Sequence, residues 1–148
     1  MALAAVLALS VVSGASASSF RKWAVGWSAK TARDNARVVD RCHALFGDDD
    51  LRFGVCYVQR GRVNLRAERV VWKRQVAAIA RGQLPACRGA IRSYVAAAEL
   101  RQMANLMYLD SHRRTPLSAI ASDVMAAPYS TLRSLSDEAR TRAVAICG

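Results

Sequence analysis

The chain has 148 residues and carries 22 lysine and arginine residues against 11 acidic residues, which gives a formal net charge of +11. This length suits one compact domain and is too short for two well-formed ones once an export signal is removed. A basic surface attracts nucleic acid, anionic lipid or an acidic protein face, although an arginine-rich proteome would decorate helices in the same way. Without a zinc-finger, basic-zipper or aromatic RNA-binding motif, we expect no specific nucleic-acid binding.

The first segment is typical of an export signal. Residues 2–12 are apolar apart from one serine, and residues 13–19 are all small. An apolar run that ends in an A-x-A pattern predicts a secretory signal peptide over residues 1–17, cleaved after Ala17. No lysine or arginine follows Met1, which departs from the usual pattern. The run is shorter than the roughly 20 apolar residues that span a bilayer, so we expect a periplasmic or secreted domain over residues 18–148.

The first predicted helix follows a polar and aromatic lead-in over residues 18–27. It begins at Ser28 or Thr31 and continues to Phe46, and Gly47 ends it. Apolar residues recur in it every three or four positions, which indicates one buried face. These residues are Val38, Val39, Cys42, Leu45 and Phe46.

The second predicted helix runs from Leu51 to Ala80. The three aspartates at residues 48–50 suit its start, because carboxylates accept hydrogen bonds from the free N–H groups there. The spaced ligands of a calcium loop are missing. Since glycine in a helix costs roughly 1 kcal/mol, Gly54 and Gly61 predict either a break in the helix or close contact with a neighbouring helix, and we favour the contact. The inward face is expected to include Val70, Val71, Trp72, Val76 and Ile79.

The second half predicts three more helices. A loop over residues 84–86 and a looser stretch over 88–97 lead into a helix over about 98–112. Pro116 suits the first turn of a fourth helix that ends near Ala126, and a capping-box sequence precedes a last helix over 137–146. The third helix is expected to bury Leu100, Met103, Ala104, Met107 and Tyr108, and the last one Ala139, Ala143, Val144 and Ile146. The fold class is therefore all-α, a single-domain bundle of about five helices.

The chain has four cysteines, and an even number in an exported chain predicts two disulfides, with three possible connectivities. They are Cys42, Cys56, Cys87 and Cys147. Their intervals of 13, 30 and 59 residues do not suit zinc. If the first two helices form an antiparallel hairpin, Cys42 and Cys56 lie near its closed end. This favours a Cys42–Cys56 bond and leaves Cys87 with Cys147.

No constellation of residues predicts an enzyme, a metal site or a cofactor. A nucleophilic site needs a cysteine or serine beside a histidine and an acid, but all four cysteines are expected in bridges. His43 lies off the apolar stripe and is expected at the surface, whereas His112 suits a helix C-terminus. Glu99 and Asp110 have no second carboxylate near them in the third helix, so ion pairing or capping accounts for both.

The tryptophans offer candidates for a protein interface. Tryptophan is favoured at binding hot spots, and Trp23 and Trp27 in the lead-in are the better candidates, although core packing is the commoner fate. Three methionines, Met103, Met107 and Met125, are expected in the core.

The cysteine layout and the segment over residues 99–125 resemble the Rap/Tai family of immunity proteins, which protect bacteria from peptidoglycan amidases injected by type VI secretion. The chain departs from the family at Tyr57, which follows Cys56 with no glycine between them, and at Arg88, where the family commonly has Ile-Pro. It also has Ala145, Ile146 and Cys147 where the family closes with Phe-Pro-Cys, and extra length over residues 128–136 before the last helix. The matching features are Cys42, Cys56 with Tyr57 and Gly61, Cys87 followed by Leu100 to Leu109, and Cys147.

This resemblance implies a periplasmic, helical, disulfide-containing protein that plugs the active-site cleft of an amidase, often as a homodimer. Protruding loops fit clefts better than helix faces do, so residues 82–97 are the candidate contact surface. The individual contact residues stay open. A cationic envelope-binding or structural protein is the alternative, and a secreted hydrolase lacks the residues it would need.

Overall fold

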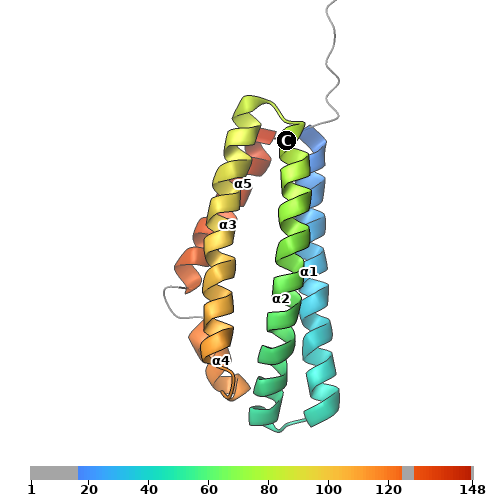
Figure 1. The fold of residues 1–148 in the computed structure, drawn as a ribbon, viewed down its shortest axis with the longest axis vertical. Coiled ribbons are helices and arrows are strands. Elements are labelled where there is room, and N and C mark those ends of the chain that lie inside the picture. Colours follow the sequence, from blue (N-terminus) through green and yellow to red (C-terminus); the bar gives the residue numbers. More distant parts are fainter. Residues whose placement is uncertain (1–16, 125–128, 148) are drawn as a thin grey trace, which may run out of the picture.

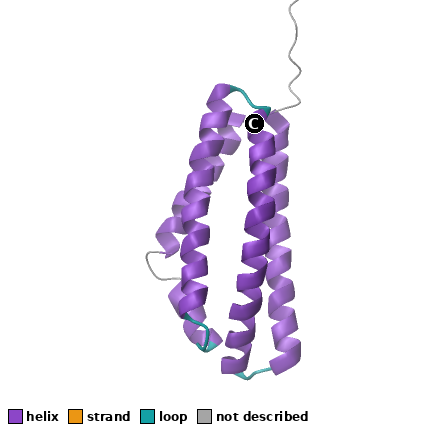
Figure 2. Ribbon diagram, viewed as in Figure 1, coloured by secondary structure: helices purple, strands orange, loops and turns teal. Residues whose placement is uncertain are grey.

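The computed structural model describes residues 17–124 and 129–147, and five helices with short connections make up this part of the chain (Figure 1, Figure 2). The predicted all-α bundle with two disulfides is confirmed. The predicted signal peptide lies outside the described residues except for Ala17. The helices are α1 (Ala17–Phe46), α2 (Asp50–Arg81), α3 (Pro85–Ser111), α4 (Leu117–Val124) and α5 (Tyr129–Cys147).

Four of the helices run up and down beside one another. α1 and α2 form a long antiparallel hairpin, α3 descends beside α2, and α5 returns along α3 while also contacting α1. The short α4 packs on α2 at the far end of the bundle. The start of α1, the end of α5 and the α2–α3 turn therefore share one end of the molecule (Figure 1).

The closed end of the α1–α2 hairpin follows the sequence prediction. Gly47 ends α1 with a φ of 55°, a left-handed conformation that favours glycine. The Asp49 side chain accepts a hydrogen bond of 3.0 Å from the Arg52 backbone N–H and so caps α2. Across this end, Cys42 and Cys56 form a disulfide with their Cα atoms 5.7 Å apart, as predicted.

The predicted close contact at Gly54 is confirmed, and α2 continues through it unbroken. A Cβ atom placed on Gly54 would lie 2.2 Å from the Thr115 carbonyl oxygen and 2.8 Å from the Leu117 nitrogen. The neighbour is therefore the backbone that leads into α4. At Gly61 the nearest atom to such a Cβ is Leu109 Cδ1, at an ordinary 3.8 Å.

Two predicted irregular stretches are helical, which corrects the sequence analysis. Residues 18–27 belong to α1, where Phe20 and Ala24 lie one turn apart and are both buried. Residues 88–97 belong to α3, where Ile91 and Tyr94 are buried at helical spacing. Burial of these side chains against other helices outweighs their modest helix propensity.

The last helix also begins earlier than predicted. α5 starts at Tyr129, so the expected capping box at residues 134–137 lies inside it. Tyr129 packs edge-on against Tyr108, with ring centroids 4.9 Å apart, and this contact holds the first turn of α5 on α3.

The core lies mainly at the end where the described chain starts and finishes. There α1, α2, α3 and α5 all contribute buried side chains, and two smaller clusters surround the Cys42–Cys56 bond and Tyr108. Fully burying a large apolar side chain stabilises a fold by about 1.5–3 kcal/mol. The main cluster comprises Phe20, Ala24, Trp72, Val76, Cys87, Ile91, Tyr94, Ala98, Ala143 and Cys147.

Several side chains predicted inside are exposed. Met103 and Met107 lie on a face of α3 that none of the five described helices covers, and Met107 is 70% exposed. α3 packs against α2 and α5, so a third face stays open to solvent. Met125 lies outside the described residues. The other exposed members of the predicted stripes are Val39, Leu45, Phe46, Val70, Val71, Leu100 and Ile146.

Candidate functional site

The strongest candidate for a binding surface is the turn between α2 and α3. Gly82 ends α2, its N–H and that of Gln83 donate to carbonyls of the last turn at 3.2 Å, and Leu84 is extended with a φ of −61°. Pro85 then opens α3, where a missing N–H costs nothing. Between α2 and α3 only residues 82–84 lie outside the helices, so this turn is tight.

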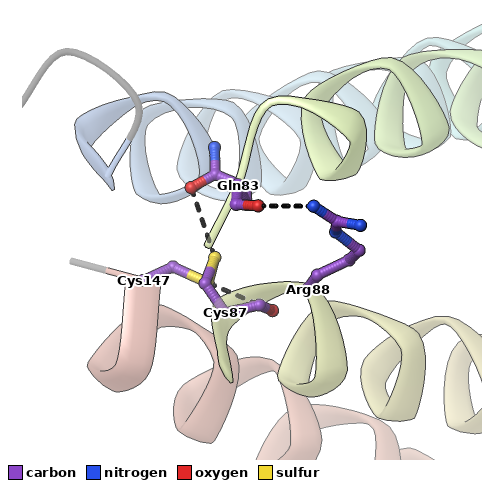
Figure 3. The surroundings of a disulfide bond; sticks show 4 residues. All are labelled: Gln83, Cys87, Arg88 and Cys147. Atoms are coloured by element: carbon purple, nitrogen blue, oxygen red, sulfur yellow. Dashed lines mark hydrogen bonds between the residues drawn. A yellow bond between two sulfur atoms is a disulfide. The ribbon is translucent and has the colours of Figure 1, made fainter. Parts of the chain in front are cut away.

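A disulfide and several polar contacts fix the shape of this turn (Figure 3). Cys87, in the first turn of α3, is bonded to Cys147 at the end of α5, as predicted, with a Cα separation of 4.9 Å. The Arg88 guanidinium donates to the Gln83 carbonyl oxygen at 3.0 Å. Gln83 Oε1 lies 3.3 Å from Cys87 Sγ. Because a disulfide sulfur has no proton to donate, the approach of Gln83 Oε1 to Cys87 Sγ is a close polar contact and not a hydrogen bond.

The turn presents an apolar residue among positive charges. Leu84 is 72% exposed, and Arg81 and Arg88 on either side of it are also exposed. Residues 81–92 include no acidic residue. We name Arg81, Leu84 and Arg88, with the turn between them, the tip. A pre-ordered tip loses little conformational freedom when it binds a partner.

The tip is smaller than the surface predicted from the sequence. Residues 82–97 were expected to be an irregular, protruding loop, but residues 85–97 form the start of α3. Two large side chains of that segment, Ile91 and Tyr94, are buried in the core and are unavailable to a partner. What remains as a protrusion is the turn itself.

The tryptophan candidates lie against the core. Trp23 and Trp27 are half-buried beside the main cluster and stack with ring centroids 6.1 Å apart. Trp23 Nε1 donates to Gln75 Oε1 at 2.9 Å, which ties α1 to α2. Trp72 is buried, as expected. The structure thus gives Trp23 and Trp27 a packing role.

The two histidines lie at helix ends. His43 is exposed in the last turn of α1. His112 follows α3, as predicted, and stacks on Tyr108 with ring centroids 4.0 Å apart. Its Nδ1 lies 2.8 Å from Ser111 Oγ, which also donates to the Tyr108 carbonyl. These contacts close the end of the helix.

The acids of α3 take part in ion pairs. Glu99 pairs with Lys73 of α2, and Asp110 pairs with Arg62, Arg66 and Arg113. Ion pairing was the role expected for both acids, and these contacts agree with it. Within the described ranges no group of three histidine, cysteine or acidic side chains is placed to hold a metal ion.

The fold and the site define a class: a small, basic helical bundle with two disulfides and a rigid, positively charged tip. None of its described helices is long and apolar enough to cross a membrane. Compared with known proteins, the chain matches no protein-family model, no curated protein and no solved structure.

Proposed function

We propose that the chain is a periplasmic immunity protein that binds a peptidoglycan amidase and occludes its active site. The observation that carries this proposal is the tip, a disulfide-braced turn that presents Leu84 between two exposed arginines. The Rap/Tai resemblance supplies the partner class. Occlusion needs shape and complementary charge and no catalytic group on this chain.

The geometry of the tip suits insertion into a cleft. Leu84 can enter an apolar subsite, while Arg81 and Arg88 can meet acidic groups on the rim of the amidase. Electrostatic complementarity of this kind speeds association and selects the partner. Because the Cys87–Cys147 bond holds the tip before binding, little ordering cost is added.

The experiment is a titration of the amidase encoded beside this gene. The wild-type protein should abolish peptidoglycan hydrolysis at about one equivalent, and Leu84→Asp should weaken inhibition at least about tenfold, since it places a charge in an apolar contact. Val63→Asp is the matched control, because Val63 is a similarly exposed apolar residue, 68% accessible, on the middle of α2. Equal inhibition by both variants would refute the role of the tip, and no inhibition by the wild-type protein would refute the function.

A second candidate function rests on the charge. Exposed arginines such as Arg33, Arg41 and Arg74 are spread over the bundle, which carries a formal charge of +11. An exported protein of this kind can bind anionic envelope polymers or lipid. Such binding would weaken steeply with added salt, whereas inhibition of an amidase through Leu84 and only two arginines should depend on salt less.

The resemblance also implies a homodimer. The exposed apolar side chains of α3, Leu100, Met103 and Met107, offer a face for it. Sedimentation at micromolar concentration tests this part of the proposal independently of the tip.

A further inference from the structure

The middle of the bundle holds a polar cleft where a helical bundle ordinarily has a packed core. The cleft has a volume of about 560 Å³ and is lined by α1, α2, α3 and α5. This volume falls within the range of about 300–1,000 Å³ found for small-molecule sites. Ligand sites in bundles are built from side chains of facing helices, and inward polar residues that break the apolar pattern are expected at such sites.

One side of the cleft has an excess of positive charge. Asp137 of α5 is approached by Arg101 Nη1 at 3.6 Å, Arg133 Nε at 3.9 Å and Arg140 Nη2 at 3.5 Å. One carboxylate therefore faces three guanidinium groups, and all three distances are longer than a charge-assisted hydrogen bond of about 2.7–2.9 Å. Arg140 Nη1 also donates to Ser28 Oγ at 2.7 Å, and the remaining guanidinium N–H groups have capacity for a second anion.

The other walls are aromatic and amide-lined. Trp27 of α1 is half-buried and lines the cleft, and the buried rings of Trp72 and Tyr94, with centroids 6.0 Å apart, lie in the core behind it. Gln102 also lines it, and its Oε1 is buried without a hydrogen-bond partner. A buried acceptor without a donor is unfavourable, so a ligand N–H group that donates to Gln102 Oε1 would be favoured.

Glu68 restricts the charge of the occupant. Its carboxyl lines the same cleft from α2 and lies 3.4 Å from Lys30 Nζ. A phosphate ester carries about −1.5 to −2 at pH 7 and would be repelled by Glu68 more strongly than a single carboxylate. The cleft thus favours a monoanion with an apolar body.

We propose that this cleft binds a small amphipathic carboxylate of the N-acylated aromatic amino-acid type. Its carboxylate lies against Arg101, Arg133 and Arg140, and its aromatic group packs on Trp27. This site is separate from the tip, so it stands whether or not the chain inhibits an amidase.

The test uses N-acetyl-L-phenylalanine as the probe, with binding measured by calorimetry and tryptophan fluorescence on the wild-type protein. N-acetyl-L-phenylalaninamide is the matched ligand without the carboxylate, and phenyl phosphate carries the alternative anion. We expect saturable binding of the carboxylate at least about tenfold tighter than that of the amide. No saturable binding, equal binding of the amide, or tighter binding of phenyl phosphate would each overturn the proposal.

Variants locate the site. Arg101→Gln should weaken binding of the probe about tenfold or more. Arg74→Gln removes an exposed arginine of α2 that does not line the cleft, so the affinity for the probe should stay within about twofold. Asp137→Asn should tighten binding several-fold because it removes the competing carboxylate, and this gain does not depend on whether the arginine variant folds. Equal loss in the two arginine variants, or weaker binding by Asp137→Asn, would refute the assignment.

Discussion

Replacing Gly54 by alanine should destabilise the protein, although the same change stabilises most helices. Alanine gains about 1 kcal/mol of helix propensity over glycine. Against this, the new Cβ would lie 2.2 Å from the Thr115 oxygen, where ordinary contacts lie at 3.4–4 Å, so the segment before α4 must retreat by about 1 Å. Overpacking costs about 1–3 kcal/mol, and the upper end applies because the three atoms in contact all belong to backbone. We expect a net loss of about 1–2 kcal/mol.

Two other glycines provide controls of opposite sign. A Cβ on Gly26 in α1 would meet nothing within 4 Å, and one on Gly61 in α2 would meet only a side-chain methyl group at 3.8 Å. Alanine at either position should raise the free energy of unfolding by about 0.5–1 kcal/mol. Thermal and urea unfolding of the oxidised protein would measure all three, with a fall of about 3–6 °C in Tm for Gly54→Ala. A Gly54→Ala variant at least as stable as the wild type would refute the close packing of α2 on the segment before α4.

Three further predictions concern stability. Replacing both Cys42 and Cys56 by alanine should lower the free energy of unfolding by about 3 kcal/mol on the chain-entropy estimate. If urea unfolding shows no loss of stability, the Cys42–Cys56 bond does not stabilise the fold by restricting the unfolded chain. Asp49→Ala should cost about 1 kcal/mol by removing the cap of α2, whereas Asp48→Ala, an exposed change beside it, should cost almost nothing in the same assay. Burial raises the pKa of the Glu68 carboxyl above its ordinary 4.5, against the opposing effect of Lys30, so the folded state binds more protons and stability falls as the pH rises above about 4.5. Glu68→Gln removes this penalty, so its Tm relative to the wild type should be higher at pH 7 than at pH 4, and the reverse order would contradict the assignment.

The parts of the fold that could be predicted depend on residues with strong local preferences. Gly47 and Asp49 mark the α1–α2 turn because a left-handed residue and a side-chain cap are needed there. The disulfide pairing followed from that hairpin, since it places Cys42 beside Cys56 and leaves one other combination.

The missed elements depend on contacts between distant residues. The start of α1 is rich in aromatic side chains, and helical spacing there becomes evident only once Phe20 is seen buried against Tyr94 of α3, with ring centroids 6.0 Å apart. The spacing of apolar residues also identified the apolar face of α3 that contains Met103 and Met107. This spacing does not show how many helices pack around α3, so it cannot tell whether that face is buried. α3 has one uncovered face, and these methionines lie on it.

The candidate sites could be predicted only in part. The cysteines marked the tip as a bridged region, but its true extent needed the helix boundary at Pro85. The central cleft had no signal in the sequence. Glu68, Arg101 and Asp137 come from three helices, and each alone reads as an ordinary surface charge.

Our central proposal is that the two disulfides clamp this bundle and hold its tip in shape in a compartment outside the reducing cytoplasm. Peptide mapping under non-reducing conditions, on protein alkylated as it is recovered from its native compartment, tests this claim most directly. We predict two linked peptide pairs, Cys42 with Cys56 and Cys87 with Cys147, and no alkylated cysteine. Four alkylated thiols would contradict the claim.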